Sequence, residues 1–208
     1  MKTDKGFTLV ELLIAMVITV IVMAAIYSVY YSQQKSYNTQ QQVAMMQQNL
    51  RGAMIMLTKD IRMAGYDPIG IVPTPAVLTA DSQDFTFIRV DDSGAATEQI
   101  SYRYNSTDDE LERDEGGGYQ TIAENIDAVN FVYLGIDNTV LSSPVADRSL
   151  IRSVQVTMVA RAEKGDPGYT DDNIYENQSG VSIFVPGAGD NRRRRVLSRQ
   201  IKCRNLGL

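Results

Sequence analysis

The chain begins with a long stretch in which nearly every position is apolar. Residues 12–34 contain no charged side chain. As a helix this stretch would extend for roughly 35 Å at about 1.5 Å per residue, which is enough to cross the hydrocarbon core of a bilayer. Tyr27, Tyr30 and Tyr31 gather at its far end, where amphipathic rings favour the membrane interface. The pattern predicts a membrane-spanning helix near the N-terminus.

The helix is expected to continue beyond this stretch with only one apolar face. Residues 32–64 contain no proline, and apolar side chains recur there in steps of three and four, at Val43, Met46, Leu50, Ala53, Leu57, Ile61 and Ala64. This spacing forms one stripe along a helix. Gly65 stands where a helix C-cap is wanted, and Pro68 prevents the helix from resuming. We expect one helix over 7–64 whose stripe packs on a domain; coiled-coil assembly through the stripe is the alternative.

After residue 66 the apolar period changes from about 3.6 to about 2, as in strands. Strands are expected over 85–90, 99–104, 129–133, 153–161, 181–185 and 196–203. Clean alternation is typical of an antiparallel sheet with one packed and one solvated face. The sequence therefore predicts an α+β fold in which the helix lies as a spine across the packed face of an antiparallel sheet.

Composition and charge narrow the function classes. The 208 residues carry a net charge of −5, which argues against general nucleic-acid binding. The absence of histidine excludes Ser-His-Asp and Cys-His sites and histidine-ligated zinc, so we expect no enzyme, cofactor or metal. Cys203 is the single cysteine, cannot form an internal disulfide, and is expected to be a small core residue.

Glu11 is the unusual residue of the apolar segment. A cleaved secretory signal fits poorly, because the apolar run is too long and no A-x-A site follows it. A plain membrane anchor fits hydropathy but does not account for Glu11. An acidic side chain costs about 3 kcal/mol at the centre of a membrane helix, and less toward the end. Such a residue usually has a charged partner, and no basic side chain stands near it in the helix.

The segment Gly6-Phe7-Thr8-Leu9-Val10-Glu11 resembles the processing motif of type IV pilins and type II secretion pseudopilins. The resemblance implies that a prepilin peptidase cuts after Gly6 and methylates the new amine on Phe7. It also implies that Glu11 pairs with the N-terminal amine of a neighbouring subunit during assembly. The partners implied are the peptidase, other minor and major pilins, the inner-membrane assembly platform and membrane lipid.

The later sequence narrows the resemblance to minor pilins. The segment 57–66, with its Arg-x-Ala-Gly-Tyr end, is similar to the helix end of PilW-type minor pilins. Residues 126–134, 151–161 and 204–205 are also similar to that family, and more weakly to J-type minor pseudopilins. Many major pilins close their C-terminal region with a disulfide, which one cysteine cannot form.

The resemblance implies four segments: a leader (1–6), a membrane or filament-core helix (7–35), an amphipathic helix spine (36–66) and a β-rich domain outside the cytoplasm (67–208). The function expected is a minor type IV pilin that helps initiate or cap a pilus, made as a single-pass inner-membrane protein and assembled at the cell surface. A J-type minor pseudopilin and a tip-exposed adhesin or DNA-binding pilin are the alternatives.

Two kinds of charged segment are further candidates. The run Arg192–Arg195 could bind an anion, although a solvated loop that begins the last strand is favoured. Acidic pairs or triplets at 91–92, 108–110 and 171–172 could hold calcium, but none matches the calcium-loop pattern. We expect these acidic segments to be solvated loops.

The processing motif generates the first testable prediction. The mature chain should begin at Phe7 and carry one methyl group, because the peptidase removes residues 1–6 and modifies the new amine. Intact-mass measurement of protein extracted from membranes checks this. A chain that retains residues 1–6 in cells with active peptidase would contradict it.

Overall fold

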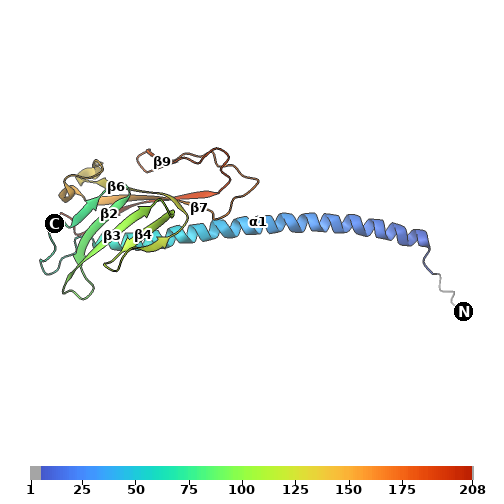
Figure 1. The fold of residues 1–208 in the computed structure, drawn as a ribbon, viewed down its shortest axis with the longest axis horizontal. Coiled ribbons are helices and arrows are strands. Elements are labelled where there is room, and N and C mark those ends of the chain that lie inside the picture. Colours follow the sequence, from blue (N-terminus) through green and yellow to red (C-terminus); the bar gives the residue numbers. More distant parts are fainter. Residues whose placement is uncertain (1–5, 208) are drawn as a thin grey trace. The chain divides into compact units, whose positions relative to one another are not determined.

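The computed structural model describes residues 6–207, which fall into two compact units that divide at Gln41. The leader predicted at 1–6 lies outside the described residues except for Gly6. Helix α1 runs without interruption from Leu9 to Met63 (Figure 1). The single long helix predicted over 7–64 is therefore confirmed, with ends that differ by one or two residues.

Every strand pair in the described part of the chain is antiparallel. One sheet has the order β1-β2-β3-β4-β5, with the bounds Val77–Ala80, Asp84–Val90, Thr97–Asn105, Glu110–Asp114 and Gln120–Ala123. A second has the order β10-β7-β6, with the bounds Arg194–Lys202, Ser153–Arg161 and Ile126–Leu134. β8 (Tyr175–Glu176) pairs with β9 (Ser182–Phe184), and two short 3-10 helices are η1 (Ile136–Asn138) and η2 (Arg148–Leu150). The α+β class is confirmed, with two main sheets where one was expected.

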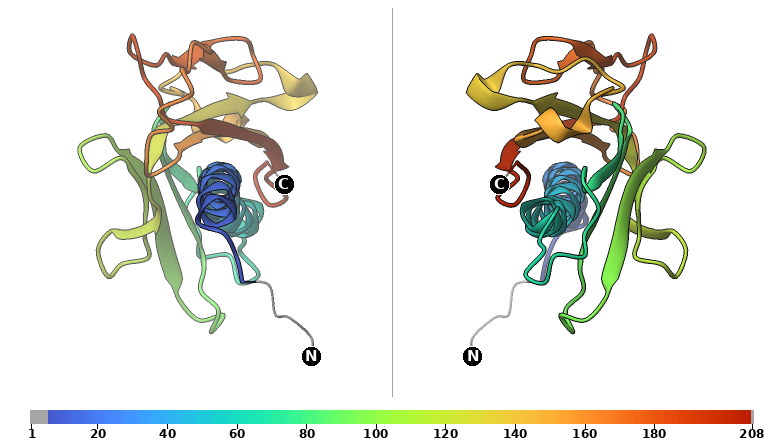
Figure 2. Two further views of the ribbon diagram at one scale, coloured as in Figure 1. Left: turned by 90° about the vertical axis from the view of Figure 1, so that its right-hand side faces the viewer. Right: turned by 90° about the vertical axis from the view of Figure 1, so that its left-hand side faces the viewer.

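The predicted stripe of α1 forms the centre of the core. Its residues Met46, Leu50, Ala53, Leu57, Ile61 and Ala64 are all buried, and Val43 is partly buried against them. The two main sheets lie on two sides of this part of the helix (Figure 2). Phe85 of β2 joins the sheets, because its ring centroid lies 6.1 Å from that of Phe131 and 5.6 Å from that of Tyr133, both on β6. The stripe thus packs within its own chain.

A buried carboxylate attaches the same helix to the five-stranded sheet. Asp60 is only 2% exposed, and its Oδ2 accepts hydrogen bonds from Tyr102 Oη at 2.6 Å and from Arg113 Nε at 2.7 Å. Burial, reinforced by the charge of Asp60, raises the pKa of Tyr102 well above its usual value, so its hydroxyl stays a donor. Because each polar group finds a charged or hydrogen-bonding partner, a polar contact is tolerated inside the core.

Gly65 ends the helix as predicted, at a position where any other residue would be strained. Its φ of +73° lies in the left-handed region, and a Cβ there would approach Leu206 Cδ2 to 2.7 Å. Its N–H donates to the carbonyl of Ile88 at 3.0 Å. On the other side, Asn205 Nδ2 donates to the carbonyl of Arg62 at 3.2 Å. The helix end, β2 and the C-terminal segment therefore meet at this glycine.

The solvated face predicted for the strand at 153–161 is covered. Thr157 and Val159 on that face of β7 are 1% and 0% exposed. The segment 163–193, which contains β8 and β9, lies over the sheet and places Tyr175 and Phe184 in a small apolar cluster with Val159 (Figure 1). The prediction of one wet face is wrong for this sheet because a later segment folds back over it.

The buried stripe generates a stability prediction with a matched control. Leu57→Ala should lower the free energy of unfolding of the full chain by about 2–5 kcal/mol, because it leaves a cavity at a site with 0% exposure. Ile55→Ala, two residues away at 67% exposure, should change it by less than about 1 kcal/mol. Denaturation of detergent-solubilised protein, followed through loss of β-structure, compares the two. Equal effects would show that the stripe does not carry the core.

Candidate functional site

The predicted processing site lies open at the start of α1. Phe7 is 91% exposed, and no atom would lie within 4 Å of a Cβ added at Gly6. α1 begins two residues later, at Leu9, so the bond between Gly6 and Phe7 lies outside the helix. A peptide bond inside a helix must unfold before a protease can bind it. The bond between Gly6 and Phe7 needs no such unfolding.

Thr8 and Glu11 form a capping box at the helix start. Glu11 Oε2 accepts from the Thr8 N–H at 2.8 Å and from the Thr8 hydroxyl at 2.9 Å, and the Glu11 N–H donates back to that hydroxyl oxygen at 3.3 Å. A carboxylate in the first turn also offsets the positive end of the helix dipole. Sequence reasoning missed this role, although the Thr-x-x-Glu spacing is its known signal. These bonds connect Glu11 to Thr8 without bringing it a positive charge.

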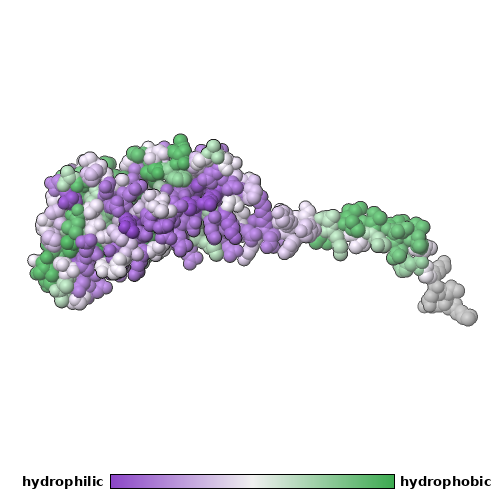
Figure 3. Space-filling model, in the orientation of Figure 1, coloured by the Kyte–Doolittle hydropathy of each residue, from purple (hydrophilic) through white to green (hydrophobic). Residues whose placement is uncertain are grey.

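The apolar half of α1 exposes its side chains on every side. Leu12, Ile14 and Ile21 are 58%, 56% and 64% exposed, and the hydrophobic colouring covers the visible face of this part of the helix (Figure 3). Within residues 6–207, α1 is the one helix long and apolar enough to cross a membrane by length and composition. Such a surface must be covered by lipid or by other apolar helices, since water would hydrate it unfavourably.

The four arginines at 192–195 do not form one surface patch. Arg194 is buried, with 2% of its side chain exposed, and Arg193 pairs with Asp166 at 2.9 Å. Arg192 is half-buried and Arg195 is exposed. The favoured prediction of a solvated loop is wrong for Arg194, and its guanidinium is not available for an external anion. The reason is that Asp171, from an acidic segment predicted to be solvated, turns inward to meet it, as do Asp127 and Asp190.

Arg194 is the cation of a buried clamp with three carboxylates. Its Nε donates to Asp127 at 2.5 Å, Nη1 to Asp171 at 2.9 Å and Nη2 to Asp190 at 2.6 Å. Asp171 is 1% exposed, so the solvated-loop prediction is wrong for it too. Burial alone would raise the pKa of Asp171, but hydrogen bonds from Arg194 and Tyr175 outweigh it and lower the pKa. The clamp fastens the segment 163–193 to β6 and β10.

The other candidates have structural roles. Asp91 accepts from the Ser93 hydroxyl and from the Ala95 N–H, and so closes its own turn, while Asp109 pairs with Arg161 at 2.6 Å. Burial raises the pKa of the Cys203 thiol to about 12, which keeps it a neutral core group as predicted. The described residues contain no group of three His, Cys, Asp or Glu side chains that could hold a metal ion.

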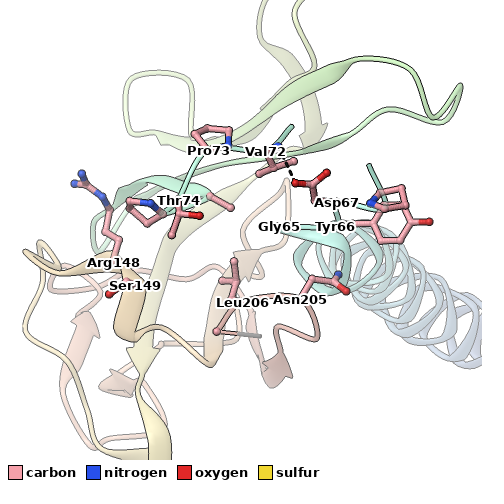
Figure 4. A pocket seen from close by; sticks show the side chains of 14 residues that line it. Gly65, Tyr66, Asp67, Val72, Pro73, Thr74, Arg148, Ser149, Asn205 and Leu206 are labelled. Carbon is pink, nitrogen blue, oxygen red and sulfur yellow. Dashed lines mark hydrogen bonds between the residues drawn. The ribbon is translucent and has the colours of Figure 1, made fainter. Parts of the chain in front are cut away.

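A pocket of about 400 Å³ lies beyond the C-terminal end of α1, between the loop after the helix, η2 and the C-terminal segment (Figure 4). Its one carboxylate, that of Asp67, accepts from the Ile71 N–H at 3.0 Å and from the Val72 N–H at 2.8 Å. Asp67 therefore shapes the loop that bounds the pocket. The remaining lining is largely prolines, glycines and small side chains, which offers no general base for catalysis.

Comparison with known proteins agrees with this geometry. Residues 1–27 match the prokaryotic N-terminal methylation motif. The structure is similar to that of a type IV-like pilin from Thermus thermophilus, with a TM-score of 0.54 and 16% sequence identity over 79% of this chain and 100% of that one. The chain has a type IV pilin-like fold. No curated protein matches it. The motif at the start of an exposed apolar helix, followed by this fold, supports a membrane-anchored pilin.

The clamp predicts an acid-sensitive segment. Asp171 and Asp190 both have a lowered pKa, Asp190 chiefly through its bond from Arg194. Their contribution to stability is present above the unfolded-state pKa of about 3.9 and is lost as the pH falls through the lower folded-state value. Pepsin, which is active across this range, should cut within 163–193 increasingly as the pH falls from 4.5 to 2.5.

Arg194→Met is the control for this experiment. It leaves Asp171 and Asp190 without their shared cation, while Asp127 keeps its pair with Arg161, so the segment should already be loose at pH 4.5. A neutral protease at pH 7 should likewise cut the variant faster than the parent chain. The assignment of the clamp fails if the variant and the parent chain are cut within 163–193 at the same rate at both pH values.

Proposed function

We propose that this chain is a minor type IV pilin, processed after Gly6 and methylated on Phe7, that helps initiate or cap a pilus. The observation that carries the proposal is the methylation motif, open to a peptidase, at the start of an apolar helix that continues into a pilin-like fold. In this proposal residues 7–35 hold the subunit in the inner membrane, and the domain after them lies outside the cytoplasm. The partners are prepilin peptidase, the assembly platform and other pilins.

Glu11 acts in assembly through its charge. The capping box gives its carboxylate two hydrogen bonds from Thr8, which reduce the cost of keeping it in an apolar environment. They do not neutralise it. The methylated amine of a neighbouring subunit supplies a cation, and in low-dielectric surroundings leaving either charge without the other costs several kcal/mol. A single subunit can therefore keep the Glu11 carboxylate in the membrane, and pairing with a neighbouring subunit is favoured.

The minor rather than major role rests on the resemblance of the helix end, 57–66, to PilW-type pilins. It is also supported by the single buried Cys203, which leaves the C-terminal region without a disulfide. A J-type pseudopilin would share these features. A DNA-binding pilin is less well supported, because Arg194 and Arg193 are engaged with carboxylates of the same chain. Asp67 is engaged by backbone N–H groups of its own loop, and Cys203 is a buried thiol. Both observations favour a structural subunit over an enzyme.

Two substitutions at Glu11 separate its charge from its capping role. Glu11→Val removes both, whereas Glu11→Gln keeps an acceptor for the capping box and removes only the charge. If the charge pair drives assembly, both variants should insert into the membrane and be cleaved normally, and both should lose entry into filaments. Sheared-filament fractions, co-purification with other pilins and surface pilus counts measure this at matched protein level.

Normal assembly of Glu11→Gln beside defective Glu11→Val would show that Glu11 serves only as a helix cap. Normal assembly of both variants would remove the charge pair from the mechanism altogether. Loss of cleavage in either variant would instead place Glu11 in peptidase recognition.

A further inference from the structure

An open groove of about 660 Å³ lies between the outward face of α1 and the neighbourhood of β10. Its lining includes three apolar or aromatic side chains, those of Ile55 (67% exposed), Met63 and Tyr66 (38% exposed). Ile55 and Met63 are eight residues apart on α1 and therefore share one helix face, the face opposite the buried stripe. This is apolar surface that the chain does not cover. We refer to it as the α1–β10 groove.

The rim of the α1–β10 groove is strongly cationic. Lys59 and Arg62 border it from α1, and Arg199 and Arg204 border it from β10 and the residues after it. All four side chains are exposed, and none takes part in an ion pair among residues 6–207. Lys59 interacts with the carboxylate of Glu115, but in a chain with a net charge of −5 this concentration of exposed cations is an exception.

The other charged residues that line the groove do not change its sign. Arg89 is buried and is bound by Glu98, and Asp92, the one acidic residue that lines the groove, lies 3.9 Å from Arg89. Glu115 lies 3.9 Å from Arg89 and also interacts with Lys59, but its carboxylate is bound by Arg113. Close cations repel one another, and an acidic partner would relieve the repulsion while its apolar side chain covered the apolar lining. A polyanion such as nucleic acid would meet the rim but leave Ile55 and Met63 hydrated. The groove therefore fits a protein surface that is both acidic and aliphatic.

The same chain presents such a surface on another side of its domain. Asp172, Ile174 and Glu176 alternate along the segment 163–193 and all three are exposed, Ile174 at 61%. We call these three residues the acidic strip. It belongs to the segment that covers the face of the three-stranded sheet away from α1 (Figures 1 and 2). A chain cannot place the strip in its own groove, so the two surfaces can meet only between two copies.

We propose that the α1–β10 groove of one copy binds the acidic strip of a second copy, with Ile174 over Ile55 and the carboxylates of Asp172 and Glu176 among the rim cations. The contact joins two different surfaces, so it is heterologous, and two copies can bind head to tail as an early step of assembly. This inference rests on the proposed pilin function, since it supplies a contact between the folded domains.

Cysteine cross-linking in membranes tests the contact with the full chain. One copy carries Ile55→Cys, and a differently tagged copy carries Ile174→Cys. Mild oxidation should give a disulfide-linked dimer of the two tags. The matched control replaces Ile174→Cys by Ile136→Cys, which is 72% exposed but outside the strip, and should give at least tenfold less dimer. Cys203 is buried and should not contribute.

Charge reversal adds the specific readout. Arg199→Glu with Arg204→Glu in the groove copy should reduce the dimer severalfold, and so should Asp172→Lys with Glu176→Lys in the strip copy. Combining the two reversed copies should restore the dimer, because the charges are again complementary. No dimer, a dimer equal to the Ile136 control, or a dimer indifferent to charge reversal would overturn the proposal. Cross-linking of the groove cysteine only to another protein would overturn it too.

The cross-linking result can be distinguished from a test of the proposed pilin function. Leader cleavage and entry into filaments are measured in the same cells. Normal entry without the cross-link removes the groove contact and leaves the pilin role standing. The cross-link without cleavage or filament entry leaves the contact and removes the role.

Discussion

The folded domain depends on burying one stripe of α1 against both main sheets. Neither sheet makes a core alone: the five-stranded sheet supplies Phe85, the three-stranded sheet supplies Phe131 and Tyr133, and Leu57 of α1 lies in the same apolar cluster at 0% exposure. Burying a large aliphatic side chain contributes about 2 kcal/mol, so the four large buried side chains of the stripe, Met46, Leu50, Leu57 and Ile61, are together comparable to the whole net stability of an ordinary domain. The same helix therefore contains the apolar segment long enough to cross a membrane and the structural centre of the domain.

Polar contacts then fix how the layers meet. Asp60 selects one rotational setting of the helix against the five-stranded sheet, because only there do Tyr102 and Arg113 reach the same carboxylate oxygen. At the helix end, Gly65 lets Leu206 and Ala76 approach the backbone. On the outer face, the Arg194 clamp holds a long segment that contributes few apolar residues of its own. Each contact fixes the position of one segment, namely the helix, the helix end or the segment 163–193, which apolar packing alone would not fix.

Sequence reasoning was reliable where the signal is local. Stripe positions such as Leu50 and Ile61 repeat every three or four residues, and Gly65 follows the last of them directly, so both the helix and its end could be predicted. The pairs that build the clamp could not, since Arg194 lies 67 residues from Asp127 and 23 from Asp171. β4 escaped notice because its sequence, Glu-Leu-Glu-Arg-Asp, is mostly charged and only its neighbours in the sheet make it a strand. The Thr8–Glu11 capping box, by contrast, has a local signal in its Thr-x-x-Glu spacing and could have been predicted.

The Arg194 clamp has a consequence for the surroundings in which the domain can work. Three converging carboxylates are the kind of arrangement that elsewhere is held together by a divalent ion, whose occupancy follows its free concentration. Here the positive charge belongs to the polypeptide and sits at the centre of the cluster with 2% of its side chain exposed. It can be neither diluted away nor removed by a chelator. The segment 163–193, with the acidic strip that it carries, therefore keeps its place in calcium-poor and calcium-rich media alike.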